Sequence, residues 1–307
     1  MKSKIPPITT HGYENFPEGV GSASDRKGEP FRLCEHPQLR GKRALVTGAG
    51  IGVGRGIALE LARQGAEVAL HYYNEADTSE SAKALIEGAG GKCFLAQADF
   101  SDPTEPGALW DVVEKRFGGL DILVNNAGIT ANAPFLDVSP EMFDRLMNVN
   151  MRAMYFLTQR AAASMMKSGG GTIVNLSSLH AEFSMNEHSV YAMSKAAVTA
   201  FTRNIALELA PHHIRVNAIA PGWCFGENHQ RLLGDESRAV DAANTPAGYL
   251  STPRDVGRLV AHLCHPDLDY FVGQTLVFDG GLSAILPTTG RFSTPISRRW
   301  GSWYLEE

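Results

Sequence analysis

Short apolar runs of β type alternate with helical patterns along most of this 307-residue chain, and this alternation limits the folds open to it. Strands that alternate with helices form a parallel sheet whose two faces are covered by the helices. The expected strands are 43–47, 67–73, 92–98, 120–126, 172–176, 214–220 and 274–280. The expected helices are one through Leu61 after the first strand, then 78–88, 107–117, 141–167, 190–210 and 253–264.

No internal repeat and no linker interrupts this pattern, so we expect one α/β domain over 41–283. Its fold class is a doubly wound Rossmann fold, with a seven-stranded parallel sheet and helices on both faces. Residues 1–40 are rich in Pro, Gly, Ser and charged residues, and they predict an irregular arm. The arm is either packed on the domain or on a neighbouring subunit, or it is a loose tail. Residues 284–307 combine four aromatic residues with three Arg and predict a tail packed against a partner subunit. The polar segment 222–250 predicts a substrate loop or lid.

Composition and charge restrict the function. Hydrophobic residues make up 44% and charged residues 20%, as in ordinary globular proteins, and the net charge of −5 argues against nucleic acid or an anionic membrane as the main partner. The four cysteines form no CxxC pair and no cluster with His, so neither a disulfide framework nor a metal site is expected. The N-terminus has no apolar leader and no apolar run approaches ~18 residues, so we expect a cytoplasmic protein without membrane spans.

A Gly-rich segment follows the first expected strand and leads into a helix. It reads Thr47, Gly48, Ala49, Gly50, Ile51, Gly52, Val53, Gly54. Where side chains are missing, the backbone can approach a pyrophosphate closely, and the start of the helix offers unpaired N–H groups. Because the segment lies between a buried strand and a helix, it predicts a dinucleotide site rather than a simple packing turn.

Two further strand ends are expected at the same edge of the sheet. Asp99 and Phe100 follow the third strand, where a carboxylate can accept a hydrogen bond from an adenine amino group. The run 126–128 follows the fourth strand, where small residues leave room for a ribose. Asn125, just before that run, is also compatible with a buried amide that ties neighbouring strands together.

Ser178, Tyr191 and Lys195 form a candidate reaction centre. Ser178 follows the fifth expected strand, and Tyr191 and Lys195 stand one helical turn apart on the next helix. An ammonium group there favours the phenolate and so lowers a pKa that is about 10 in a free tyrosine. Such a tyrosine can donate or accept a proton at neutral pH, and Ser178 can hydrogen-bond the same reacting oxygen. An isolated Tyr-x-x-x-Lys pair is usually an ordinary amphipathic turn, so its companions carry the prediction.

Taken together, these motifs resemble the short-chain dehydrogenase/reductase family. The matching stretches are TGxxxGxG at 47–54, NNAG at 125–128, Asn150, Ser178, YxxxK at 191–195, PG at 221–222 and Asp-Gly-Gly at 279–281. They occur in the family's order over 41–283, and SSLH at 177–180 resembles its glucose and ribitol dehydrogenase branch. The resemblance implies an enzyme that oxidises an alcohol or reduces a ketone with NAD or NADP and that requires no metal.

The resemblance also implies a role for each reacting residue. Tyr191 is the general acid/base, Lys195 lowers the pKa of Tyr191 and binds the nicotinamide ribose, and Ser178 positions the substrate oxygen. Asn150 holds a water that connects Lys195 with solvent. The implied cofactor contacts are Thr47, Gly48, Ile51, Gly52, Val53, Gly54, Asp99, Phe100, Asn126, Ala127, Gly128, Tyr191, Lys195, Pro221 and Gly222.

The sequence leaves the choice between NAD and NADP open. An acidic residue at the end of the second strand favours NAD and a basic one favours NADP, but the chain has Tyr72, Tyr73 and Asn74 there. Ile51 occupies a position that is often Arg in the NADP users of the family. Asn74 or His71 can hydrogen-bond either cofactor.

The loop between Ser178 and Tyr191 is polar. Its polar residues predict a polyhydroxylated substrate if they face the pocket, and otherwise they are solvated loop residues. They are His180, Glu182, Asn186, Glu187 and His188. Ser178 and His180 are the expected substrate contacts, and Trp223 is expected to form an apolar wall or to stack on a sugar.

We therefore expect a sugar or polyol dehydrogenase acting on a small alcohol or ketone. The alternatives are a carbonyl or 3-oxoacyl-thioester reductase, and a non-catalytic dinucleotide sensor that keeps the fold. The complete set of reacting residues argues against the sensor. The family also implies a homodimer or homotetramer, and the apolar helices 141–167 and 190–210 are suited to its interfaces.

Overall fold

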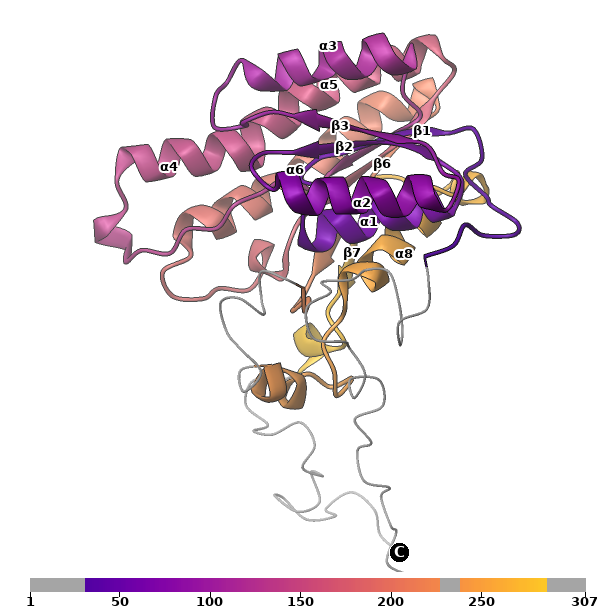
Figure 1. Cartoon of the computed structure of the whole chain (residues 1–307). Coiled ribbons are helices and arrows are strands. Elements are labelled where there is room, and N and C mark those ends of the chain that lie inside the picture. The colour runs from indigo at the N-terminus through magenta and orange to yellow at the C-terminus, as the bar shows by residue number, and fades with distance from the viewer. Residues whose placement is uncertain (1–30, 227–237, 286–307) are drawn as a thin grey trace, which may run out of the picture.

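The computed structural model describes residues 31–226 and 238–285 (Figure 1). Within these residues, seven strands form one parallel sheet in the order β3-β2-β1-β4-β5-β6-β7. The strands are β1 Arg43–Val46, β2 Glu67–Tyr72, β3 Cys93–Gln97, β4 Ile122–Asn125, β5 Gly171–Leu176, β6 Ile214–Pro221 and β7 Thr275–Phe278. The sequence prediction of a doubly wound parallel sheet is confirmed.

Helices cover both faces of the sheet, because successive strand residues face opposite sides. The helices are α1 Gly52–Arg63, α2 Ala76–Gly88, α3 Glu105–Phe117, α4 Pro140–Met147, α5 Ala153–Lys167, α6 Ser189–Leu209 and α8 Pro253–Leu263. In β1, Ala44 and Val46 pack with α1, α2 and α8, whereas Leu45 packs with α3, α5 and α6 on the other face. Figure 1 shows α3 and α5 above the sheet and α1, α2 and α8 below it.

The helix predicted over 141–167 is interrupted. It consists of α4 and α5, joined by a π-helical turn over Asn148–Arg152. A π-turn widens the helix by one residue and changes the direction of the side chains in it. Asn150, a predicted site residue, lies in this turn and is buried.

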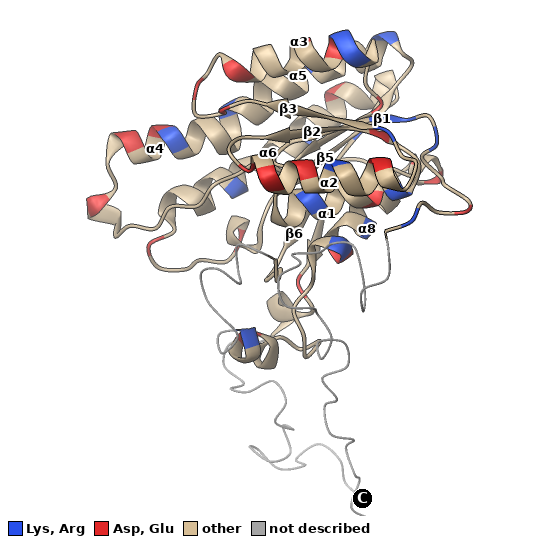
Figure 2. Cartoon of the chain, in the orientation of Figure 1, with Lys and Arg blue, Asp and Glu red and all other residues tan. Residues whose placement is uncertain are grey.

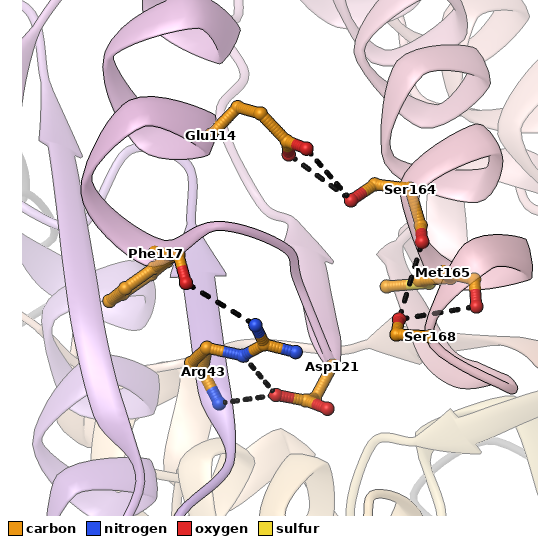
Figure 3. A network of polar contacts seen from close by, with 7 residues as sticks. All are labelled: Arg43, Glu114, Phe117, Asp121, Ser164, Met165 and Ser168. Atoms are coloured by element: carbon orange, nitrogen blue, oxygen red, sulfur yellow. Dashed lines mark hydrogen bonds and ion pairs between the residues drawn. The ribbon is translucent and has the colours of Figure 1, made fainter.

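The amino ends of β1 and β4 are joined by an ion pair on the side of the sheet away from the predicted site (Figure 3). Arg43 donates to Asp121 from Nε at 2.7 Å and from its backbone N–H at 2.9 Å. Its Nη1 also donates to the carbonyl oxygen of Phe117 at 3.3 Å. Ser164 of α5 donates to Glu114 of α3 at 3.1 Å. These contacts fasten α3 and α5 together and to the sheet.

Charged residues lie mainly on the outward faces of the helices and in the loops, as Figure 2 shows, and the sheet between the helix layers carries few. No disulfide joins the four cysteines, all of which lie in the described ranges. None of the described helices has the length and apolar character that a transmembrane span requires.

Most of the predicted arm 1–40 and of the tail 284–307 lies outside the described residues. The described part of the arm contacts the end of α1: Cys34 N–H donates to Arg63 O at 2.8 Å, and Leu39 N–H donates to Gln64 O at 2.9 Å. Of the predicted loop 222–250, residues 227–237 lie outside the description, and residues 238–244 are helical rather than irregular.

Candidate active site

The predicted site residues meet at the carboxyl edge of the sheet. The Gly-rich segment follows β1, the run 126–128 follows β4, Ser178 follows β5, and Gly222 follows β6. In a parallel sheet all of these strand ends lie at one edge, where ligands bind in open α/β folds. The sheet thus brings together segments that are far apart in the sequence.

Two positions of the Gly-rich loop require glycine, one because of its backbone conformation and the other because of close packing. Gly48 has φ +63°, a left-handed conformation that favours glycine. A Cβ on Gly54 would overlap the carbonyl oxygen of Gly48 and the side chain of Asn126. Ile51 is the N-cap residue of α1, so the start of this helix faces the crevice. A backbone cradle at a helix start fits a dinucleotide pyrophosphate.

Thr47 and Asn126 hold the first and fourth loops against each other. The Asn126 side chain donates to Thr47 O at 2.9 Å and to Gly48 O at 3.1 Å. The Thr47 hydroxyl accepts from the N–H groups of Asn126 and Ala127, both at 3.0 Å. Both side chains therefore shape the predicted cofactor site by bonding to the protein's own backbone.

At the predicted adenine end of the site, Asp99 is bonded to a neighbouring residue in a turn, whereas Phe100 is buried. Asp99 Oδ1 accepts from the N–H and the hydroxyl of Ser101, at 2.9 and 2.7 Å, which fixes the carboxylate in a turn. Phe100 is buried and stacks on the His71 ring, with centroids 4.2 Å apart. Of the two residues that could hydrogen-bond the cofactor from this strand end, Asn74 or His71, the structure argues against His71, because both of its ring nitrogens are bonded to the backbone at Gly48 and Ala98.

An acidic residue that the sequence analysis missed stands beside the Gly-rich loop. Glu75 precedes α2, three residues after the end of β2, and a methyl group built on Gly50 would lie 3.2 Å from Glu75 Oε2. The same oxygen accepts from the N–H groups of Tyr73 and Asn74 at 3.4 and 3.3 Å. The turn after β2 carries this carboxylate back to the loop, and a search of the strand end alone could not find it.

The reaction centre forms where β5 faces α6. The Tyr191 hydroxyl is hydrogen-bonded to Ser178, and Lys195 Nζ stands 5.7 Å from the centroid of the Tyr191 ring. Lys195 Nζ also donates to the carbonyl oxygen of Leu176 at 2.8 Å. The three predicted reacting residues are thus brought together.

Burial is the largest influence on the pKa values of Lys195 and Tyr191. It lowers the pKa of Lys195 to about 8. It raises the pKa of Tyr191, and the hydrogen bond with Ser178 offsets this only in part. The expected lowering of the Tyr191 pKa is therefore not seen in this structure, because spacing along a helix reports which residues share a face but not the cost of burying a phenolate.

Asn150 lies next to Lys195 and to a small cavity. Its Oδ1 accepts from Ile129 N–H at 2.8 Å, and its Nδ2 donates to Ile129 O and to Ser194 Oγ, both at 3.0 Å. Asn150 and Lys195 line a cavity of about 10 Å³, enough for about one water. Asn125 Oδ1, in the same lining, has no hydrogen-bond partner among the described residues and can accept from a water there.

Asn125 also has the structural role considered from the sequence. Its Nδ2 donates to Thr158 Oγ1 at 2.9 Å and to Asn175 Oδ1 at 2.8 Å. Asn175 in turn donates to Thr202 Oγ1 at 2.9 Å. This buried chain ties β4 and β5 to α5 and α6, the helices behind the reaction centre.

The loop after β6 approaches the site from the last strand. Gly222, after Pro221, donates its N–H to Phe278 O at 3.0 Å, and a Cβ there would lie 2.8 Å from Asp279 Cβ. Trp223 follows and has 37% of its surface exposed. Its backbone oxygen accepts from the Ser251 hydroxyl at 3.1 Å.

Two histidines of the polar loop surround Tyr191. The rings of His180 and His188 stack with centroids 5.1 Å apart, and their centroids lie 5.7 and 6.1 Å from that of the Tyr191 ring. His188 is buried and its Nδ1 is bonded to Asn186 O at 3.0 Å, and His180 is partly buried. Burial and the neighbouring His188 lower the pKa of His180. The two histidines therefore lie beside Tyr191, although the sequence singled out only His180.

Among the described residues, no three His, Cys, Asp or Glu side chains are grouped in a way that could hold a metal ion.

Comparison with known proteins gives a consistent result. A family model described as enoyl-(acyl carrier protein) reductase matches residues 48–283. The hydroxynaphthalene reductase-like protein Arp2 of Metarhizium robertsii is 38% identical over 258 residues, which cover 79% of this chain and 95% of that protein. The tetrahydroxynaphthalene reductase PfmaG of Pestalotiopsis fici is 34% identical over 260 residues, covering 80% of this chain and 93% of that protein. The solved 7α-hydroxysteroid dehydrogenase in complex with NADH and 7-oxoglycochenodeoxycholic acid is 35% identical with a TM-score of 0.76, covering 80% of this chain and 96% of that one.

Proposed function

This chain belongs to the short-chain dehydrogenase/reductase family of NAD(P)-using oxidoreductases, and we propose that it interconverts a secondary alcohol and a ketone on a hydroxylated ring substrate. The observation that carries the proposal is the contact of Ser178 with Tyr191, with Lys195 one helical turn away. A structural binding module would not need these three groups together in a buried centre.

In the proposed mechanism, Ser178 and the Tyr191 hydroxyl bind the same oxygen of the substrate. When bound, a nicotinamide dinucleotide supplies or accepts the hydride. Tyr191 gives its proton to the oxygen of a ketone, or takes the proton of an alcohol in the opposite direction. Lys195, whose pKa is about 8, stabilises the phenolate formed in this step and can pass a proton on through a water between it and Asn150.

For the cofactor we propose NAD, and the position of Glu75 supports this choice. Glu75 Oε2 lies beside the Gly-rich loop, in the turn that follows the second strand, and the adenosine ribose binds near the end of this strand in Rossmann folds. A carboxylate there accepts hydrogen bonds from ribose hydroxyls and repels the 2′-phosphate of NADP. Asp99, after β3, stays the proposed contact for the adenine amino group. We propose the remaining cofactor contacts as the resemblance implies them.

For the substrate, the surroundings of Tyr191 combine polar and apolar groups. The His180 and His188 rings lie beside the Tyr191 ring, and Phe183 and Met185 on the same loop are 46% and 44% exposed. A ring with hydroxyl groups can use both kinds of contact. The names of two relatives refer to hydroxylated naphthalenes, which supports the ketone-reductase alternative.

A sugar or polyol is the second candidate, because His180 is polar and close to Tyr191. The test is to titrate the purified protein with NADH and NADPH and then to follow the nicotinamide absorbance. The panel contains hydroxylated cyclic ketones, sugars, polyols and a 3-oxoacyl thioester. Turnover of a hydroxylated cyclic ketone supports the first candidate, and turnover of sugars or polyols alone supports the second. Cofactor binding without turnover of any member would favour the dinucleotide-sensor alternative.

We further propose a homodimer or homotetramer, a cytoplasmic location and the domain limits 41–283.

The oligomer is supported by aromatic residues on the outer surfaces of α5 and α6. Tyr155 and Phe156 are 45% and 43% exposed, and the Tyr155 ring centroid lies 5.2 Å from that of Phe201. Exposed aromatic groups that cluster on neighbouring helices are typical of protein interfaces.

A further inference from the structure

His71 is the last residue but one of β2 and has only 2% of its surface exposed. On one side it holds two successive N–H groups of the Gly-rich loop. Gly48 N–H donates to His71 Nδ1 at 3.0 Å, and Ala49 N–H donates to the His71 carbonyl oxygen at 2.6 Å. These two N–H groups are therefore committed to the protein and do not serve a phosphate.

On its other side, the same ring reaches the loop after β3. Because Nδ1 accepts from Gly48, the proton of the neutral ring is on Nε2, which donates to Ala98 O at 3.1 Å. The ring also stacks on Phe100 with an interplanar angle of 11°. One side chain thus connects the loop predicted to hold the pyrophosphate with the loop predicted to hold the adenine.

We propose that His71 is a positioning residue for the dinucleotide, whose neutral ring fixes the Gly48 and Ala98–Phe100 loops at the separation that the adenosine half requires. The inference rests on the proposed dinucleotide site, but it concerns a residue that does not touch the ligand. Gly48 has φ +63°, and the bond to His71 holds this residue in its left-handed conformation.

Burial lowers the pKa of His71 to about 4, which keeps the ring neutral at physiological pH. A protonated ring would point an N–H at the Gly48 N–H, and that bond would be lost. The groups that face the ring are the backbone of Gly48 and Ala98 and the aromatic ring of Phe100, none of which carries a charge. The clamp is thus built from neutral groups only.

The simpler interpretation is that His71 fills space in the core, and two variants separate the interpretations. In His71→Asn, the amide oxygen takes the place of Nδ1 and keeps the acceptor for Gly48. In His71→Gln, the longer side chain keeps a donor for Ala98 but loses that acceptor. His212→Asn, at an exposed position beyond α6, is the matched control.

The experiment measures the Kd for NADH by fluorescence titration, together with the KM for NADH and kcat for a substrate found in the panel. Loss of the Gly48 bond in His71→Gln should raise the Kd and KM for NADH about 5- to 30-fold, the effect of one buried hydrogen bond. His71→Asn keeps the Gly48 bond but loses the bond to Ala98, so it should also raise the Kd for NADH, by about 5-fold. His212→Asn should bind NADH within about 3-fold of the wild type, since less than ~0.7 kcal/mol separates them. In all variants kcat at saturating NADH should stay within about 2-fold, because the reaction centre is unchanged.

Equal Kd values for NADH in His71→Gln, His71→Asn and the wild type would overturn the proposal and leave His71 as a core residue. Failure of both His71 variants to fold, judged by circular dichroism, would also count against it. If the wild type binds no nicotinamide dinucleotide, the proposed function fails. This result differs from the one that overturns the role of His71, in which the wild type binds NADH and the His71 variants bind it equally well.

Discussion

Cofactor choice gives the sharpest test of the site, because it depends on the charge of one side chain. We expect the wild type to prefer NADH to NADPH and Glu75→Gln to lose most of this preference. The substitution removes the charge of Glu75 but keeps its length. The amide oxygen can still accept from Tyr73 and Asn74 N–H, as Oε2 does at 3.4 and 3.3 Å, so the turn should keep its shape.

The size of the effect follows from Coulomb's law. A doubly charged phosphate and a carboxylate about 5 Å apart repel each other by roughly 2–3 kcal/mol at an effective dielectric constant of about 40–80. Removing the carboxylate charge should therefore tighten NADPH binding by roughly 30- to 150-fold. NADH should bind about 10-fold more weakly, because a charge-assisted hydrogen bond to the ribose becomes a neutral one.

The assay is a fluorescence titration of wild type and variant with NADH and NADPH at two salt concentrations. Asp77→Asn is the control, because it removes the same charge from an exposed position in the first turn of α2. High salt should narrow the difference between the two cofactors in the wild type, since salt screens partly exposed charges. A wild type that prefers NADPH, or an Asp77→Asn variant that shifts the preference as much as Glu75→Gln, would refute the reasoning.

Three further predictions follow from other parts of the molecule. Tyr191→Phe should reduce turnover by a factor of about 10²–10⁴ while NADH binding stays within about 3-fold, because only the proton donor is removed; lost NADH binding would mean that the residue is structural. Asp121→Asn should lower the free energy of unfolding at pH 7 by about 1 kcal/mol. Burial raises the pKa of Asp121, but the hydrogen bonds from Arg43 outweigh this and leave the pKa below its ordinary value. The ion pair therefore contributes its full stabilisation at pH values above the ordinary pKa of Asp, and this stabilisation is lost as the pH falls through the lowered pKa of Asp121. Urea denaturation at pH 7 and pH 3 should therefore show a smaller difference between variant and wild type at pH 3, and an equal difference would contradict this account. Phe156→Asp should lower the mass measured by light scattering with an unchanged circular dichroism spectrum, and a monomeric wild type would exclude the proposed oligomer.

The fold could be predicted because each strand is a continuous apolar run. The strands are buried on both faces, so their sequences need no alternation, and the helices between them set the parallel order. The break within 141–167 was not predicted, because a widened turn has no sequence marker of its own and accompanies tertiary contacts of Asn150. The region contains neither Pro nor Gly to mark it.

Within the site, the sequence predicted which residues meet but not how their environment acts on them. Ser178, Tyr191 and Lys195 come together because strand ends and helix faces have fixed geometry. The direction of the Tyr191 pKa shift was predicted wrongly, because it depends on how much water reaches the hydroxyl group. Similarly, His188 is separated from His180 by eight positions in the sequence, and only the folded loop stacks the two rings.

The end of β2 shows why a residue's nearness to a strand end is not enough to assign its role. His71 lies inside the strand, so its ring is held between the neighbouring loops and its polar atoms are used by the backbone. Glu75 lies beyond the strand, where the turn brings its carboxylate next to Gly50 of the Gly-rich loop. A polar residue within a buried strand must find partners in the protein, whereas one just past the strand can keep an oxygen for a ligand. In this chain, the residue inside the strand is therefore assigned to positioning the loops and the residue beyond it to selecting the cofactor. The variants His71→Gln and Glu75→Gln should thus differ in kind: the first should weaken both cofactors together, and the second should change their ratio.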